Sequence, residues 1–160
     1  MKLKIYVKTF GNESRMPEII AKGDWIDLYI SGEFKTTKYN KGNSALLPLG
    51  VAMQLPEGYE AHVLPRSSSF SKFGFIQTNS QGIIDNPYNG DNDEWKEPVY
   101  FLRTQEMNPR DKICQFRIEL SQKATIWQRL KWLFVSGVEF IKVDSLNNPD
   151  RHGFGSTGSR

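Results

Sequence analysis

Residues 112–120 read KICQFRIEL, and apolar and polar side chains alternate along this stretch. Every second residue from Cys114 to Leu120 is apolar, and the residues between them are polar. A period of two is that of a β-strand, because successive side chains point to opposite faces. The stretch therefore predicts a strand with one face in the core and one polar face.

Other segments have the same signature, with Gly and Pro between them. They are residues 3–7 (LKIYV), 25–30 (WIDLYI), 45–65 and 99–103. Many short strands separated by turns predict an all-β sandwich or barrel. At 160 residues the chain fits one domain, which we expect over residues 1–150.

Two segments depart from this pattern. In residues 124–135, apolar residues recur at a helical spacing, which predicts a short helical insertion. Such a basic, Trp-containing helix suits either a membrane surface or packing on the sheet or a neighbouring subunit, and we favour packing. Residues 151–160, RHGFGSTGSR, are rich in Gly and Ser and predict a mobile C-terminal arm.

The composition excludes several classes of function. The net charge is only +3, and Lys and Arg are scattered among acids, so we expect no nucleic-acid partner. Cys114 is the only cysteine, which rules out an intramolecular disulfide and suits a reducing cytoplasm. The N-terminus does not resemble a signal peptide, and no apolar run has membrane-spanning length. We therefore expect a cytoplasmic protein with no membrane partner.

Several polar clusters could carry chemistry, although each has a simpler interpretation. Asp85 ends an apolar pair and opens a turn, where Asp is common for purely structural reasons. Residues 65–74 (PRSSSFSKFG) place Arg66 before three serines, which suits phosphate or a solvated loop. We interpret His62 as structural. Cys114 falls on the apolar face of its strand and is expected to be inert.

Five stretches, in order, resemble the motifs of the trimeric dUTPase family, in the variety found in Gram-positive bacteria and their phages. They are GDWIDLYI (23–30), PRSSSFSKFG (65–74), NSQGIIDNPYNGD (79–91), RDKICQFRI (110–118) and RHGFGSTG (151–158). The resemblance implies a jelly-roll β-barrel of the β-clip type and a homotrimer with shared active sites. It implies hydrolysis of dUTP to dUMP and pyrophosphate with Mg²⁺, which limits uracil in DNA and supplies dUMP for thymidylate synthesis.

The resemblance also implies roles for single residues. Asp85 matches the catalytic carboxylate, which orients and deprotonates a water for in-line attack on the α-phosphorus. Tyr88 matches the ring that packs on the deoxyribose, and Asp27 matches the acid that reaches magnesium through water. The positions that match substrate contacts are Arg66, Ser67, Ser68, Asn79, Gly82, Ile84, Tyr88, Gln115, Arg151, Phe154, Ser156 and Thr157.

The sequence departs from the family pattern in places. Ser68 replaces the usual Gly, Cys114 replaces the usual Ala, and the fifth motif is shortened between Arg151 and Phe154. Trp95 is an alternative aromatic cover for the base. A dCTP deaminase-type relative is a rival interpretation, but the third motif has no matching glutamate. A nucleotide-gated regulatory interaction protein is another, for which the insertion would be the partner surface.

Overall fold

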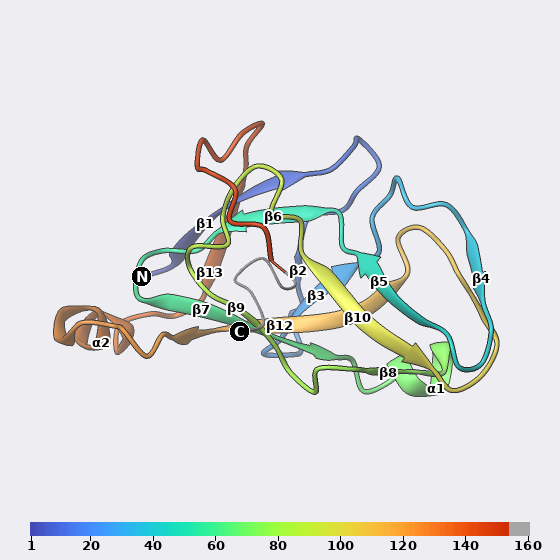
Figure 1. Cartoon of the computed structure of the whole chain (residues 1–160). Helices are drawn as coiled ribbons and strands as arrows, with labels where there is room; N and C mark the ends of the chain where they lie inside the picture. Colours follow the sequence, from blue (N-terminus) through green and yellow to red (C-terminus); the bar gives the residue numbers. More distant parts are fainter. Residues whose placement is uncertain (154–160) are drawn as a thin grey trace, which may run out of the picture.

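The computed structural model describes residues 1–153, and these form thirteen strands and two short helices (Figure 1). The elements are β1 (Leu3–Thr9), β2 (Glu18–Ile19), β3 (Ile26–Tyr29), β4 (Thr37–Tyr39), β5 (Ser44–Pro48), β6 (Val51–Gln54), β7 (Tyr59–Pro65), α1 (Ser69–Phe73), β8 (Phe75–Gln77), β9 (Gly82–Ile84), β10 (Lys96–Phe101), β11 (Gln105–Met107), β12 (Lys112–Leu120), α2 (Ile126–Trp132) and β13 (Val138–Lys142). The expected all-β class is confirmed.

The strand predicted from KICQFRIEL lies in the middle of the largest sheet, whose order is β2-β3-β12-β7-β9. β12 is antiparallel to both β3 and β7. Cys114, Phe116 and Ile118 are buried in the core, as their spacing predicted, and the residues between them are partly exposed. This strand positions the site, because motif residues on β3, β7 and β9 are aligned through it.

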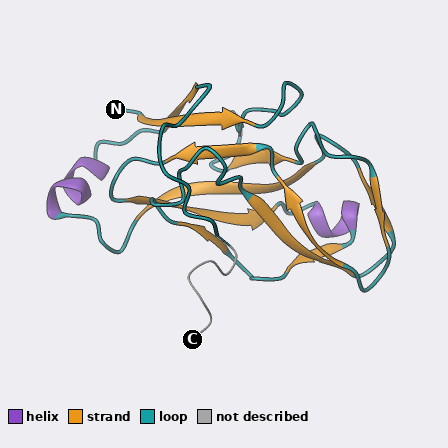
Figure 2. Cartoon of the chain, turned by 45° about the horizontal axis from the view of Figure 1, so that its top comes forward, coloured by secondary structure: helices purple, strands orange, loops and turns teal. Residues whose placement is uncertain are grey.

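Smaller sheets cover the other side of the core, in the orders β13-β1-β6, β5-β10-β8 and β11-β4. β1 and β6 form a layer over β7 and β12, and α1 and α2 lie at opposite ends of the molecule (Figures 1 and 2). One continuous cluster of buried apolar residues joins the layers. Burial of this apolar surface is the main stabilising contribution to such a fold.

Two buried residues differ from what the sequence pattern suggested. The alternation in residues 25–30 places Asp27 on the face opposite Ile26 and Leu28, which a strand with one buried face would expose, but all of β3 is buried, Asp27 included. Trp95, the alternative cover for a base, is fully buried, and its ring lies 5.3 Å from that of Phe116 in an edge-on contact. Trp95 is therefore a core residue, and the suggestion that it covers a base was wrong.

Helix α2 forms inside the predicted insertion and is held by a capping box. The Thr125 hydroxyl accepts from Gln128 N at 3.3 Å, and Gln128 Oε1 accepts from Thr125 N at 2.7 Å. Gln128 also lies over Gly58, whose φ of 84° suits glycine, and donates to the Glu57 carbonyl at 3.1 Å. Trp132 packs on Tyr59 with 5.5 Å between ring centroids.

The opposite side of α2 and the residues after it present an apolar stripe to the outside. Its members are all exposed in the single chain: Ile126, Trp127, Leu130, Leu133 and Phe134. An apolar stripe of this kind marks an interaction surface more often than a free one. No helix within residues 1–153 is long and apolar enough to cross a membrane.

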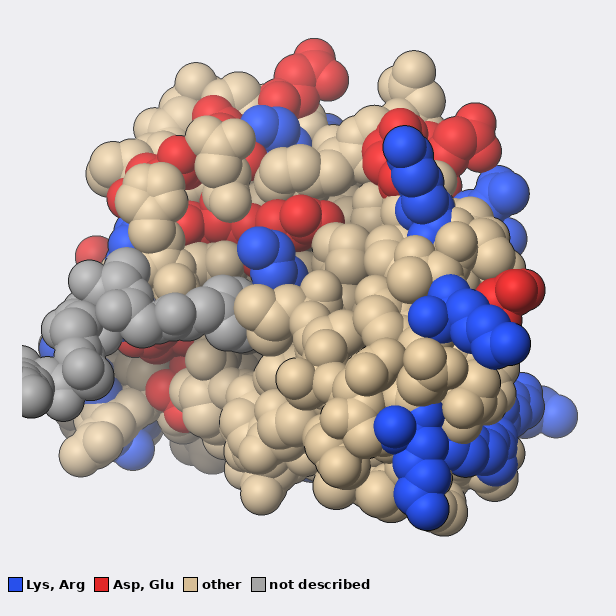
Figure 3. Space-filling view, turned by 45° about the vertical axis from the view of Figure 1, so that its right-hand side comes forward, with Lys and Arg blue, Asp and Glu red and all other residues tan. Residues whose placement is uncertain are grey.

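Charges that are scattered in the sequence are partly sorted in space. On the face shown in Figure 3, acidic side chains are most frequent in the upper part and Lys and Arg along the right-hand edge, and each area also contains charges of the other sign.

Candidate active site

Asp85 is placed by a turn that its neighbours fix. β9 ends at Ile84, and the Tyr88 N–H donates to the Asp85 carbonyl at 3.0 Å. Asn86 Nδ2 donates to the carbonyls of residues 55 and 56 at 2.7 and 3.1 Å, which ties the turn to the β6–β7 connection. The Asp85 side chain is about half exposed and lines an open pocket of about 860 Å³. A carboxylate in this position can reach a water in the pocket.

Tyr88 stands beside this turn with its ring largely buried. Its hydroxyl donates to the Glu94 carbonyl at 2.8 Å. Burial, with added repulsion from the carboxylates of Asp93, Glu94 and Asp150, raises the pKa of Tyr88 to about 12. The phenol therefore stays neutral and fixed. A Cβ on Gly153 would lie 3.0 Å from Cε2 of Tyr88, so the chain after Asp150 covers part of the ring.

The segment that precedes β9 is ordered by a neighbouring glutamine. Asn79 is exposed, and its Oδ1 accepts from Gln77 Nε2 at 2.7 Å. Gln77 also donates to the Val63 carbonyl at 3.3 Å. Gly82 lies against Val63, where an added Cβ would come within 3.3 Å of the Val63 Cβ. The side-chain amide of Asn79 is therefore held in one orientation, and the backbone at Gly82 lies close to Val63.

A second group of matched residues surrounds Asp27. Arg66 Nε donates to Asp27 Oδ1 at 2.9 Å, and Lys112 Nζ forms an ion pair with Oδ2 at 2.9 Å. Lys112 also pairs with Glu18 at 2.9 Å. Burial disfavours the charged ammonium, but the contacts with Glu18 and Asp27 outweigh it, so the pKa of Lys112 is raised. The carboxylate of Asp27 therefore orients the Arg66 guanidinium, and its expected contact with magnesium through water stays a prediction.

The three serines after Arg66 have different surroundings. Ser67 is exposed and Ser68 half-buried at the start of α1, so both can meet a ligand. Ser69 is buried: its Oγ donates to the Ile113 carbonyl at 2.5 Å and accepts from Arg66 N at 3.0 Å. Ser69 thus locks the loop onto β12, a structural role that the run of serines does not reveal.

The single chain keeps these two groups apart. The register of β7 with β9 pairs Ala61 with Ile84, which puts Asp85 level with Glu60. Arg66 lies six residues further along the chain (66 minus 60), or about 20 Å at roughly 3.3 Å per residue. Gln115, which donates to the Pro65 carbonyl at 3.4 Å, belongs with Arg66.

Arg151 is the matched residue that the chain brings to Asp85. Its guanidinium forms an ion pair with Asp85 Oδ1. The backbone around it is held by Asp93, a buried residue that the sequence interpretation did not single out. Asp93 Oδ2 accepts from Gly90 N and Arg151 N at 2.9 and 2.8 Å, and Oδ1 accepts from His152 N at 2.9 Å. The remaining matched positions lie outside the described residues: Phe154, Ser156 and Thr157.

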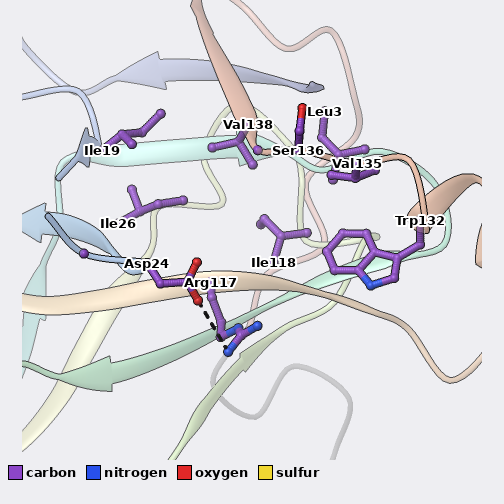
Figure 4. Close-up of a pocket in the computed structure, with 12 residues that line it drawn as sticks. Leu3, Ile19, Asp24, Ile26, Arg117, Ile118, Trp132, Val135, Ser136 and Val138 are labelled. Atoms are coloured by element: carbon purple, nitrogen blue, oxygen red, sulfur yellow. Dashed lines mark ion pairs between the residues drawn. The ribbon is translucent and has the colours of Figure 1, made fainter. Parts of the chain in front are cut away.

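A second pocket, of about 370 Å³, lies beside β2 and β3, at the opposite edge of the large sheet from β9 (Figure 4). Trp132 and Ile118 face into it, and an ion pair between Asp24 and Arg117, at 3.8 Å, stands at its edge. None of the described residues that match substrate or magnesium contacts lines it. Asp85 is the one such residue that lines the pocket of about 860 Å³, so we place the candidate site at Asp85 and the neighbouring residues 79–88.

Known proteins resemble this chain over the stretches that contain the motifs. The family model described as dUTPase matches residues 26–119. A SPbeta prophage-derived deoxyuridine 5'-triphosphate nucleotidohydrolase, YosS, of Bacillus subtilis (strain 168) is 44% identical over 158 residues, which cover 99% of this chain and all of the relative. The chain belongs to the dUTPase family. The motif resemblance found in the sequence is thereby confirmed.

Solved dUTPase structures share the fold. The dUTPase from Streptococcus mutans superposes with a TM-score of 0.64 at 21% identity, covering 74% of this chain and 98% of that one. A mutant dUTPase from phage phi11 of S. aureus, described with a structural Mg(II) ion, gives 0.64 at 20% identity, covering 76% and 94%. The expected jelly-roll β fold of the dUTPases is thus confirmed.

Proposed function

We propose that this chain hydrolyses dUTP to dUMP and pyrophosphate, with Asp85 orienting and deprotonating the water that attacks the α-phosphorus. The observation that carries the proposal is the Asp85 carboxylate, fixed on a family-motif turn and open to a pocket of about 860 Å³. A general base must lie within hydrogen-bond reach of the proton that it takes. The reaction limits uracil in DNA and supplies dUMP for thymidylate synthesis.

The base and sugar would lie along residues 79–88, which contain β9 and the turn of Asp85. Asn79 and the main chain at Gly82 and Ile84 pair with the edge of uracil, and Tyr88 packs on the deoxyribose. The contact from Gln77 that presets Asn79 supports this assignment. Cytosine would leave fixed polar groups unmatched, which discriminates strongly.

The phosphates would meet the Arg66 group and the arm. Arg66 presents a planar fork of donors suited to phosphate oxygens, and Asp27 holds it in one orientation. Ser67, Ser68 and Gln115 complete this group. Arg151 contacts the γ-phosphate, and in the arm beyond it Ser156 and Thr157 contact phosphate while Phe154 covers uracil.

Magnesium would come to the site with the triphosphate. The described residues hold no group of three or more His, Cys, Asp or Glu that could form a protein cage. They suit an ion that keeps several waters and takes phosphate oxygens, as Mg²⁺ does. When bound, the ion neutralises charge on the departing pyrophosphate. Asp27 would act on it through water only, because its carboxylate faces Arg66 and Lys112.

A homotrimer with shared sites would complete the constellation. Within one chain, Asp85 and Arg66 are about 20 Å apart by register, too far to act on neighbouring phosphates of one nucleotide. A neighbouring copy that supplies Arg66 and the residues around it to the Asp85 turn removes this separation. The site is therefore incomplete in a single chain.

Pyrophosphate release tests the function directly. We expect release from dUTP in the presence of Mg²⁺, and far less from dTTP, dCTP and UTP or without the ion. Ammonia from dCTP would instead identify a deaminase. Absence of both products with every nucleotide would overturn the proposal.

The outward apolar stripe of α2 favours a second candidate function, nucleotide-gated binding of a partner protein. Deleting residues 124–135 and measuring hydrolysis separates the two functions. Full activity without the insertion would leave the stripe available for a partner. Loss of activity would show that the insertion serves the enzyme itself.

A further inference from the structure

The root of the arm, residues 150–153, is fastened to residues 90–93 of its own chain, which follow the turn that carries Asp85. Asp93 is almost completely buried and accepts three backbone N–H groups, two of which, those of Arg151 and His152, belong to the arm root. Its third bond, from Gly90 N, keeps the carboxylate in place. A buried carboxylate that is satisfied by backbone donors is a strong and specific anchor.

A second contact fastens the same segment. Asp150 accepts from Asn92 N at 2.8 Å and from Asn92 Nδ2 at 2.7 Å. These bonds, the backbone one first, lower the pKa of Asp150. The two segments approach so closely here that a Cβ on Gly90 would lie 2.5 Å from the Cα of Asp150. The arm root therefore follows the turn of residues 90–93 without a gap.

These contacts of Asp93 and Asp150 fix the position of Arg151. Its backbone is held, but its side chain reaches the surface, where it pairs with the catalytic carboxylate of Asp85. Both side chains are substantially exposed, at 36% and 49%. An ion pair of this exposure contributes little stability and exchanges readily. A triphosphate, which offers several charged oxygens, competes well for the same guanidinium.

We propose that Asp93 is a positioning residue for Arg151. It holds the arm root against residues 90–93, beside the turn that carries Asp85, so that the Arg151 side chain exchanges between Asp85 in the free enzyme and phosphate oxygens when dUTP binds. The inference rests on the proposed function for the second half of this exchange. The clasp itself, made by Asp93 and Asp150, is a property of the free chain and can be tested without any activity.

Trypsin digestion of the free, full-length protein tests the clasp. Trypsin cleaves after Arg, so loss of residues 152–160, followed by mass, reports local opening at the bond between Arg151 and His152. We expect Asp93→Asn to speed this cleavage by at least about tenfold. Gly90→Ala should do the same by pushing Asp150 away. Gly90 does not adopt the left-handed backbone that would require glycine, so this variant keeps every bonding group.

Asp91→Asn is the matched control. Asp91 lies on the same turn, but it accepts from Ser145 Oγ and Leu146 N, upstream of the arm root. Cleavage after Arg151 should stay at the wild-type rate in this variant. Wild-type resistance in both Asp93→Asn and Gly90→Ala would overturn the clasp. If Asp93→Asn does not fold, Gly90→Ala decides alone.

A double-mutant cycle, measured by steady-state kinetics, distinguishes a positioning role of Asp93 from a purely structural one. We expect Asp93→Asn to raise the KM for dUTP about tenfold with a much smaller change in kcat, and to have no further effect when Arg151→Ala is already present. Effects that multiply in the double variant would overturn the positioning role. If the wild-type protein releases no pyrophosphate from dUTP, the proposed function fails, and the trypsin result still decides the clasp.

Discussion

Asp27 and Arg66, 39 residues apart in the sequence, are joined by a hydrogen bond of 2.9 Å from Nε to a carboxylate with no exposed surface. The same carboxylate pairs with Lys112. A buried charge is stable only when it is paired, so Asp27 fixes two cations at the end of β7 and β12. One of these cations is the residue that we assign to phosphate binding.

We expect Asp27→Asn to destabilise the protein by about 2–4 kcal/mol at neutral pH, because Lys112 loses a buried counter-ion. The KM for dUTP should also rise, because Arg66 is less firmly oriented. Urea unfolding and steady-state kinetics measure the two effects. Glu18→Gln is the control: it removes the exposed partner of Lys112 and should cost less than about 1 kcal/mol. Equal losses in both variants would contradict this account.

Asp85→Asn should abolish turnover and retain nucleotide binding. The amide keeps the shape of the side chain but cannot take the proton of the attacking water, a contribution of roughly 10²–10⁴ in rate. Calorimetry with a non-hydrolysable dUTP analogue checks binding, and pyrophosphate release checks turnover. Near-normal turnover would defeat the assignment of Asp85.

Removing residues from Arg151 onward should collapse activity and leave the oligomer intact. The deleted residues are proposed to contact phosphate and cover uracil, whereas strands β1 to β13 are complete without them. Light scattering after size-exclusion chromatography gives the oligomeric state. Dissociation of the truncated protein would show that the arm is structural.

Glu97 should make the protein less stable as the pH rises. It is fully buried, neither carboxylate oxygen has a hydrogen-bond partner within residues 1–153, and burial raises its pKa to about 8 from an ordinary value of 4.5. The folded state therefore keeps a proton that the unfolded state releases. Stability is unaffected below about pH 4.5 and declines up to about pH 8, by on the order of 5 kcal/mol in total.

Glu97→Gln tests this effect, because glutamine has the same shape and no charge. Urea unfolding at a series of pH values should show the decline between about pH 5 and pH 8 in the wild type and a much flatter profile in the variant. A wild-type profile that matches the variant would show that Glu97 is ionised at no cost in the folded protein.

Cys114 should resist thiol reagents in the folded protein. It is fully buried, and burial first, then the nearby Glu97 and Asp27 carboxylates, raises its pKa well above the ordinary value. Thiolate is the reactive form, so both access and ionisation are suppressed. We expect no labelling by iodoacetamide until the protein is unfolded in urea. Rapid labelling of the native protein would contradict the burial of this strand.

Local pattern alone predicted the strands that build the sheet. Alternation in residues 3–7 and 112–120 predicted which side chains enter the core, and helical spacing predicted α2. The motif order identified the family, and with it Asp85. These features depend on residues that are close in the chain, so a linear pattern suffices to find them.

Only the tertiary structure decided the partners of these residues. Three features depend on segments that are far apart in the sequence. They are the burial of Asp27 and Trp95, the ion pair of Arg151 with Asp85, and the hydrogen bonds from the arm root to Asp93. In each case the residue type is compatible with a solvated surface as well as with a buried contact. Strand register and layer packing select between these environments, and the pattern of a single segment does not contain them.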